Sequence, residues 1–201
     1  MRILYASNNK DKIEDIKEGI ALISKSIDVV GLVEIGLDIE VEETGETLLE
    51  NATLKAQTVY DKIKGTNFDN FDFIIGEDFG FYLDAFAGVA GIHAKRWKDG
   101  NNLDRASAIV ELFETTKETN KKATFSCAMC CINKQGNKFE VLEHLTGNIG
   151  TRKPTKDGFG YHQIVQMEDG RYLNDYGAVE KRAIWSRQKA LVSILKQINL
   201  I

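Results

Sequence analysis

Two long strand-like segments separated by a short polar turn constrain the fold most. Residues 123–133 and 138–149 flank residues 134–137, whose sequence Lys-Gln-Gly-Asn is a hairpin signal. The N-terminal part differs, because a short apolar run at residues 2–6 is followed by a helix-like periodicity over residues 10–24. A hairpin combined with alternating strands and helices predicts an α/β fold with a mixed sheet, built as one folding unit over residues 1–201.

The remaining elements follow from local patterns. A capping box at Thr47 and Glu50 predicts where the second helix begins. Further strands are expected at residues 27–33 and 71–75, and further helices at residues 47–64, 103–116 and 185–197.

Composition limits the classes of partner. The 201 residues are 43% apolar and 28% charged with a net charge of −4, which fits a globular protein. No run of Lys and Arg forms the basic footprint of a nucleic-acid-binding protein. Neither a signal peptide nor an apolar stretch of membrane-spanning length is evident, so we expect a cytoplasmic protein without a membrane partner.

All cysteines fall in one apolar run. Cys127 and Cys130 have the spacing of half a zinc site or of a redox pair, and Cys131 follows directly. The histidines are scattered and supply no second ligand pair, so buried, reduced thiols on a strand are favoured.

Three carboxylates are candidates for metal chemistry. Glu77 and Asp78 follow the apolar run at residues 71–75, and we expect them at the carboxyl end of that strand, where open α/β sheets bind ligands. Adjacent acids repel each other, and Mg²⁺ with oxygen ligands would relieve that repulsion; a solvated acidic turn is the alternative. Glu43 precedes the capped helix, where it could equally favour the helix dipole.

Two segments suggest phosphate binding. Asn51 and Lys55 lie four residues apart on one helix face, beside its apolar stripe. The turn with Ser7, Asn9 and Lys12 joins a strand to a helix, where backbone N–H groups and a cation can hold phosphate. The chain lacks a Walker pattern, and both a solvated lysine and an ordinary turn remain alternatives.

Two further segments suggest contacts to a flat ligand. In residues 158–161, glycines alternate with aromatics, so the backbone could approach a ring that an aromatic side chain stacks on. Lys181 and Arg187 lie around the start of the last helix, where they could bind purine oxygens or be ordinary surface charges.

Taken in order, these motifs resemble the inosine triphosphate (ITP/XTP) pyrophosphatase family. The resemblance extends from residue 3 to residue 195, and it rests on joint order and spacing rather than on any single motif. Its segments are Ser7-x-Asn9-x-x-Lys12, Glu43-Thr44-Gly45, Glu50-Asn51-Ala52-x-x-Lys55-Ala56, Glu77-Asp78-x-Gly80, Gly158-Phe159-Gly160-Tyr161 and Lys181-x-x-Ile184-x-x-Arg187-x-x-Ala190-Leu191.

The resemblance implies a fold and a reaction. The fold would be a long twisted mixed sheet with flanking helices and two lobes around a nucleotide cleft, in a homodimer. The reaction would be Mg²⁺-dependent hydrolysis of non-standard purine triphosphates such as ITP, dITP and XTP to the monophosphate and pyrophosphate, which clears the nucleotide pool.

The resemblance also implies roles for single residues. Asp78 would activate water, and Glu43, Glu77 and Asp78 would be the metal-binding carboxylates. Lys12 and Lys55 would assist catalysis while holding the triphosphate. The full substrate-binding set would be Ser7, Asn9, Lys12, Asn51, Lys55, Phe159, Gly160, His162, Lys181, Ser186 and Arg187, with Phe159 stacking on the base and Lys181 and Arg187 facing its polar edge.

The chain departs from the family pattern at some positions. Glu77 and Phe79 stand where the family has Asp and Ser, and His162 replaces an acid near the base. The family's Ser-His-Arg is Trp185-Ser186-Arg187 here, so that Trp185 replaces a serine and Ser186 replaces a base-reading histidine. The triphosphate groups are retained while groups around the base change, so we expect altered base selectivity rather than altered catalysis. A nucleotide-binding regulatory protein without turnover, and an unrelated α/β protein with chance matches, are the alternatives.

Overall fold

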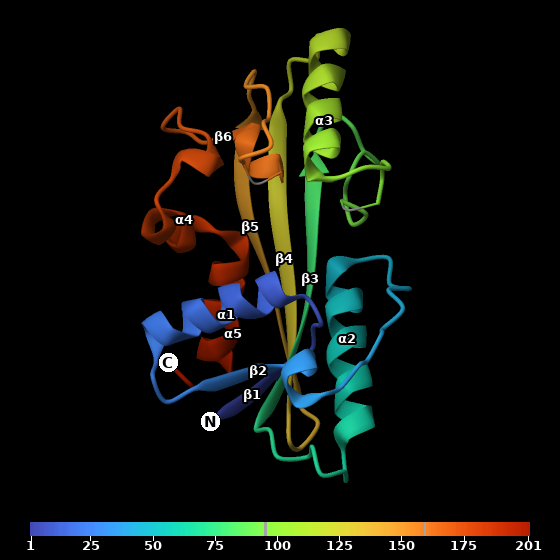
Figure 1. The fold of residues 1–201 in the computed structure, drawn as a ribbon, viewed down its shortest axis with the longest axis vertical. Coiled ribbons are helices and arrows are strands. Elements are labelled where there is room, and N and C mark those ends of the chain that lie inside the picture. The colour runs from blue at the N-terminus through green and yellow to red at the C-terminus, as the bar shows by residue number, and fades with distance from the viewer. Residues whose placement is uncertain (95, 159) are drawn as a thin grey trace. The chain divides into compact units, whose positions relative to one another are not determined.

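The chain forms a mixed six-stranded sheet with helices packed on it, as the sequence predicts (Figure 1). The computed structural model describes residues 1–94, 96–158 and 160–201. The strand order is β2-β1-β3-β4-β5-β6; β1 pairs in parallel with β2 and β3, and β5 pairs antiparallel with β6. The strands are β1 (Arg2–Tyr5), β2 (Asp28–Gly31), β3 (Phe73–Leu83), β4 (Lys122–Asn133), β5 (Lys138–Ile149) and β6 (Val165–Gln166). The α-helices are α1 (Lys10–Ile23), α2 (Leu48–Ile63), α3 (Asn102–Thr116), α4 (Ala178–Ile184) and α5 (Ser186–Gln197).

The chain divides into two compact units, which are described separately. The first unit contains Met1–Phe79, Cys127–Glu143 and Ser186–Ile201, and the second contains Gly80–Ser126 and His144–Trp185.

In the first unit, helices cover both faces of the strands. Helices α1 and α5 lie on one side and α2 lies on the other (Figure 1). Helix α1 buries Ile13, Ile16 and Ile20 in a core that also takes up Leu191 and Ile194 of α5. Because the apolar residues of α1 recur at three- and four-residue steps, one face of the helix enters this core.

Helix α2 packs very closely on β3. Its capping box is present as predicted, with Thr47 accepting from the Glu50 N–H. A Cβ atom at Gly76 of β3 would lie 2.2 Å from the Ala52 carbonyl oxygen and 2.6 Å from the Ala56 nitrogen, both in α2. Glycine at position 76 therefore allows the helix backbone to approach the strand.

The second unit is organised around aromatic side chains. Phe81 of β3 stacks on Tyr161 with ring centroids 4.5 Å apart and contacts Phe125 of β4 at 4.6 Å. The Tyr161 hydroxyl donates to the Ala94 carbonyl and accepts from the Trp97 indole N–H. These contacts hold Tyr161, in the short 3₁₀ helix Gly160–Gln163, against other residues of the second unit.

Several sequence predictions need correction. The third strand does not end at Ile75 but runs to Leu83, so Glu77 and Asp78 lie inside β3 rather than beyond its carboxyl end. The predicted strand at residues 27–33 is shorter, because a 3₁₀ helix begins at Leu32. Helix α4 was not predicted.

The predictions of a hairpin and of buried thiols are confirmed. Strands β4 and β5 are neighbours joined by residues 134–137, where Gly136 adopts a φ of 85°. Cys127, Cys130 and Cys131 are free, buried thiols on β4. Across the described ranges, no helix combines the length and the apolar character needed to span a membrane.

We predict that Gly76→Ala destabilises the first unit. The added methyl group would meet helix backbone, which cannot rotate away as a flexible side chain can. Overpacking of this kind costs about 1–3 kcal/mol. Urea unfolding of the variant and the wild type measures the difference, and equal midpoints would contradict the close approach of α2 to β3.

We predict that Asp72 stabilises the junction of β1 and β3 in a pH-dependent way. Its Oδ2 accepts the Arg2 backbone N–H at 2.8 Å, and Lys134 lies 3.1 Å from Oδ1. These contacts, the backbone hydrogen bond first, lower the pKa of Asp72 below its ordinary value of 3.8. The contribution is therefore present above that value and is lost as the pH falls below it.

The test compares Asp72→Asn with the wild type by urea unfolding. At neutral pH the variant should be less stable by about 1 kcal/mol. As the pH falls below the ordinary pKa of 3.8 and through the lowered pKa of Asp72, the difference should shrink, since the wild-type carboxylate is then also being protonated. A difference that does not change with pH would contradict this role.

Candidate functional site

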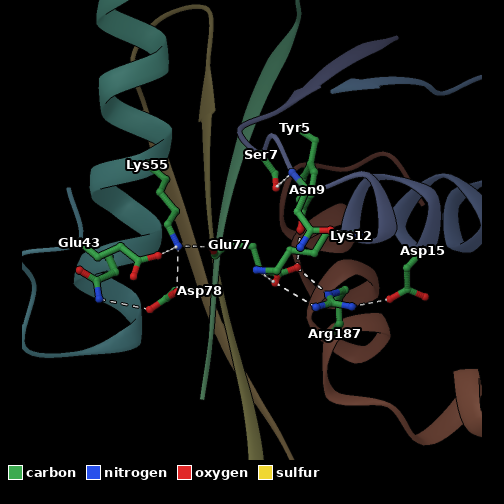
Figure 2. Close-up of polar contacts among 11 residues, drawn as sticks. Tyr5, Ser7, Asn9, Lys12, Asp15, Glu43, Lys55, Glu77, Asp78 and Arg187 are labelled. Carbon is green, nitrogen blue, oxygen red and sulfur yellow. Dashed lines mark hydrogen bonds and ion pairs between the residues drawn. The ribbon is translucent and has the colours of Figure 1, made fainter. Parts of the chain in front are cut away.

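The candidate site is built on two adjacent carboxylates that face opposite sides of β3. Glu77 is 3% exposed and Asp78 is 7% exposed. Successive side chains of a strand alternate between its faces, so Glu77 points toward α1 and α5 while Asp78 points toward α2 (Figure 2). Each buried charge thus has its own surroundings.

Glu77 is surrounded by hydrogen-bond donors. Lys12 Nζ lies 2.8 Å from its Oε1, Arg187 Nε lies 2.8 Å from its Oε2, and the Tyr5 hydroxyl also donates to Oε2. Burial alone would raise the pKa of Glu77, but Arg187 and Lys12 outweigh that effect and hold it well below its usual range. Glu77 is therefore ionised at neutral pH.

Arg187 is in turn held by a second carboxylate. Its Nη1 lies 2.8 Å from Asp15 Oδ2, and Gln188 Nε2 donates to Asp15 Oδ1 at 3.0 Å. The Arg187 side chain is only 13% exposed. Helices α1 and α5 are thus joined by an ion pair that continues to β3 (Figure 2).

Asp78 is held from α2. Lys55 Nζ lies 2.8 Å from Asp78 Oδ1, and Asn51 Nδ2 donates to Oδ2 at 3.2 Å. Lys55 also contacts the Glu77 carbonyl oxygen at 3.0 Å and Glu43 Oε1 at 2.7 Å. Burial lowers the pKa of Lys55, but its carboxylate partners outweigh that effect and raise it, so the lysine is charged.

Asn51 also holds the segment before α2. Its Oδ1 accepts the Gly45 backbone N–H at 2.8 Å, two residues after Glu43. The prediction that Asn51 and Lys55 share a helix face is confirmed, since both contact Asp78. Asn51 and Lys55, one turn apart on α2, therefore hold both Asp78 and the segment that carries Glu43. Both carboxylates contact the same lysine, Lys55.

The predicted phosphate turn lies at the start of α1. Asn9 caps this helix, with its Oδ1 accepting the Lys12 backbone N–H at 3.2 Å, and Ser7 Oγ accepts the Asn9 backbone N–H at 3.2 Å. Figure 2 shows Ser7, Asn9 and Lys12 on the Glu77 side of β3. Helix N–H groups and a lysine thus lie together in one turn, as a phosphate site requires.

A separate hollow of about 680 Å³ lies along the first turns of α2. Its lining is Thr44, Gly45, Glu46, Thr47, Leu49, Glu50, Thr53, Leu54 and Glu140. Three of these side chains are acidic, and none of the described lining residues is a lysine or an arginine. This hollow is therefore unsuited to a triphosphate.

The residues that we expect to contact a base are divided between the two units. Gly160, His162 and Lys181 belong to the second unit, and Phe159 lies outside the described residues. His162 is 5% exposed and packs edge-on against Trp185, with ring centroids 4.5 Å apart. Ser186 is fully buried at the start of α5. Their contacts to a base stay predictions.

The carboxylates suit a hard metal ion by their chemistry. Mg²⁺ prefers oxygen ligands, and Glu43 and Asp78 already converge on one cationic group, the Lys55 ammonium. Within the described ranges, no group of three or more His, Cys, Asp or Glu side chains is arranged to hold a metal ion. In this arrangement Glu77 faces away from Asp78, so a shared metal site of Glu43, Glu77 and Asp78 stays a prediction.

Two residues of the site were missed from the sequence. Tyr5 lies in the apolar run of β1, where a hydroxyl gives no signal of a partner. Asp15 lies three residues after Lys12 on α1, and that spacing could have indicated a shared helix face.

We predict that Arg187→Met destabilises the protein strongly. The change would leave Asp15 and the buried Glu77 with one cationic partner fewer. Removing one member of a buried pair costs about 3–5 kcal/mol. Urea unfolding at neutral pH measures this loss.

Arg171→Met is the matched control. Arg171 also pairs with two carboxylates, Asp169 and Glu180, but its side chain is 43% exposed. Ion pairs this exposed contribute little to stability, so the control should unfold almost as the wild type does. Equal losses in the two variants would show that burial of the Arg187 pairs is unimportant.

Comparison with known proteins identifies the family. The model of the Ham1 family matches residues 3–197. The dITP/XTP pyrophosphatase of Clostridium tetani is 31% identical over 98% of this chain and 96% of its own length, and that of Clostridium perfringens is 31% identical over 94% and 93%. The solved structure of the Staphylococcus aureus Ham1 protein matches the fold with a TM-score of 0.81 at 24% identity, covering 99% of this chain and 98% of that one. The chain belongs to the Ham1 family.

Proposed function

We propose that this protein is a nucleoside triphosphate pyrophosphatase that acts on non-standard purine triphosphates of the dITP, ITP and XTP type. The products would be the nucleoside monophosphate and pyrophosphate. The observation that carries the proposal is the pair of buried carboxylates Glu77 and Asp78, each paired with a lysine. Relatives named dITP/XTP pyrophosphatase that align along nearly the whole chain support the substrate class.

Phosphate binding is assigned to the lysines. The ammonium groups of Lys12 and Lys55 are each paired with a carboxylate of β3, so both are already positioned before a ligand binds. A triphosphate that approaches them would exchange carboxylate oxygens for phosphate oxygens. The N–H groups at the start of α1, beside Ser7 and Asn9, add further donors for the same anion.

Asp78 is assigned the role of general base. Once Lys55 turns to phosphate, the Asp78 carboxylate is free to take a proton from water, and Asn51 keeps it oriented. The water oxygen bonds to the α-phosphorus, and the bond to the bridging oxygen breaks. Pyrophosphate leaves with both bonding electrons, and the lysines stabilise its charge.

Mg²⁺ is the proposed cofactor, with Glu43, Glu77 and Asp78 as the residues that would hold it. When bound, the ion would supply positive charge to the phosphate oxygens. The hard oxygen donors of these side chains support this choice, and two of them, Glu43 and Asp78, already converge on Lys55.

The base end completes the proposal. Phe159 would stack on the base, with Gly160, His162, Lys181, Ser186 and Arg187 as its other contacts. The changes at His162 and Ser186 support the alternative in which the base selectivity differs from this substrate class while the cleavage chemistry is kept. A homodimer and a cytoplasmic location belong to the same proposal through the family resemblance.

We predict that the purified protein with Mg²⁺ releases pyrophosphate from purine triphosphates and that Asp78→Asn lowers kcat by at least about 100-fold. Loss of a positioned general base has an effect of this size. Separate assays for pyrophosphate and phosphate over a panel of purine and pyrimidine triphosphates measure the reaction.

Asp61→Asn is the matched control for this experiment. Asp61 lies exposed on α2 and accepts from Gln57, so the same chemical change there should leave kcat unaltered. Release of single phosphates would overturn the cleavage site, and binding without turnover would favour a regulatory protein. Turnover of ITP and XTP far above all other triphosphates would contradict the altered selectivity.

A further inference from the structure

Tyr5 is a buried polar side chain that has no role in the proposed reaction. It lies at the end of β1 and is 0% exposed. Its neighbours on the strand, Ile3 and Leu4, are apolar core residues. A buried hydroxyl is costly unless it is hydrogen-bonded, and here it donates to Glu77 Oε2.

The two oxygens of Glu77 have different partners. Oε2 is held by the Tyr5 hydroxyl and by Arg187 Nε, which Asp15 anchors through the other side of the guanidinium. Oε1 is held by Lys12 at 2.8 Å and by the longer contact of Arg187 Nη2 at 3.3 Å. Oε2 is therefore held by Tyr5 and by the shorter Arg187 contact, whereas the shortest contact of Oε1 is with the Lys12 ammonium group.

This asymmetry decides what happens when Lys12 turns to a phosphate group. Oε1 then loses its shortest contact, while the contacts of Oε2 do not involve Lys12 and remain. A Glu side chain has three rotatable bonds, so without partners at Oε2 the released carboxylate could swing away from the site. Tyr5 and Arg187 keep it in place at that moment.

We propose that Tyr5 is a positioning residue for the pyrophosphatase reaction. Its hydroxyl fixes Oε2 of Glu77, so that Oε1 is the carboxylate oxygen that takes part in the reaction. This inference rests on the proposed function and adds a residue to it. Tyr5 acts only through Glu77, because it touches neither the lysines' ammonium groups nor Asp78 in the contacts described.

The test is Tyr5→Phe, which removes the hydroxyl and keeps the ring that packs in the core. Loss of a group that orients a reactive carboxylate lowers activity by about tenfold. We expect that loss in kcat for pyrophosphate release, with KM for the triphosphate changed by less than about twofold, since the triphosphate-binding groups are untouched. Thermal unfolding of each variant verifies that it is folded.

Tyr60→Phe is the matched control. Tyr60 is also a largely buried tyrosine of the first unit, and its hydroxyl donates to the Lys134 carbonyl rather than to a site residue. The control should keep the wild-type kcat. An equal loss in both variants would assign the effect of Tyr5 to general packing and overturn the inference.

A double-mutant cycle with Glu77→Asp gives the decisive readout. The shorter carboxylate is withdrawn from the Tyr5 hydroxyl, so Tyr5→Phe should have no further effect in that background. The same loss in both backgrounds, or no loss in either, would overturn the positioning role while leaving the proposed function standing. A wild-type protein that releases no pyrophosphate overturns the proposed function itself, so the two failures are distinguishable.

Discussion

The structure of the first unit depends on the burial of two neighbouring carboxylates on opposite faces of β3. A buried carboxylate without a partner is strongly destabilising, so each face must supply a cation. Lys12 and Arg187 come from α1 and α5 on one face, and Lys55 comes from α2 on the other. The position of these three helices against the strand is therefore set by charge as well as by apolar packing.

In the proposed reaction, the same ion pairs would prepare the site for a charged ligand. A lysine that is already held at a fixed place by a carboxylate does not have to be ordered when a phosphate group arrives, which lowers the cost of binding. The proposed exchange of a carboxylate for a phosphate group would also keep each lysine paired with an anion throughout. Charge that is arranged before the reaction is the most effective kind of electrostatic catalysis, because no reorganisation is needed in the transition state.

Local patterns predicted much of the fold and part of the site. The capping box of α2 and the shared face of Asn51 and Lys55 depend on residues three or four apart, so spacing alone reveals them. The course of β3 through Glu77 was missed because adjacent acids beside glycines are typical of a turn. The burial of Glu77 depends on Arg187, 110 residues away in the chain, and no local pattern carries that information.

The departures from the family pattern at residues 162 and 185 gain a physical account within the second unit. His162 and Trp185 pack edge-on at 4.5 Å, and both rings also contact Phe125, at 5.6 Å and 5.1 Å. A new aromatic ring at one position creates a surface on which a ring at the other can pack, so the two differences behave as one change.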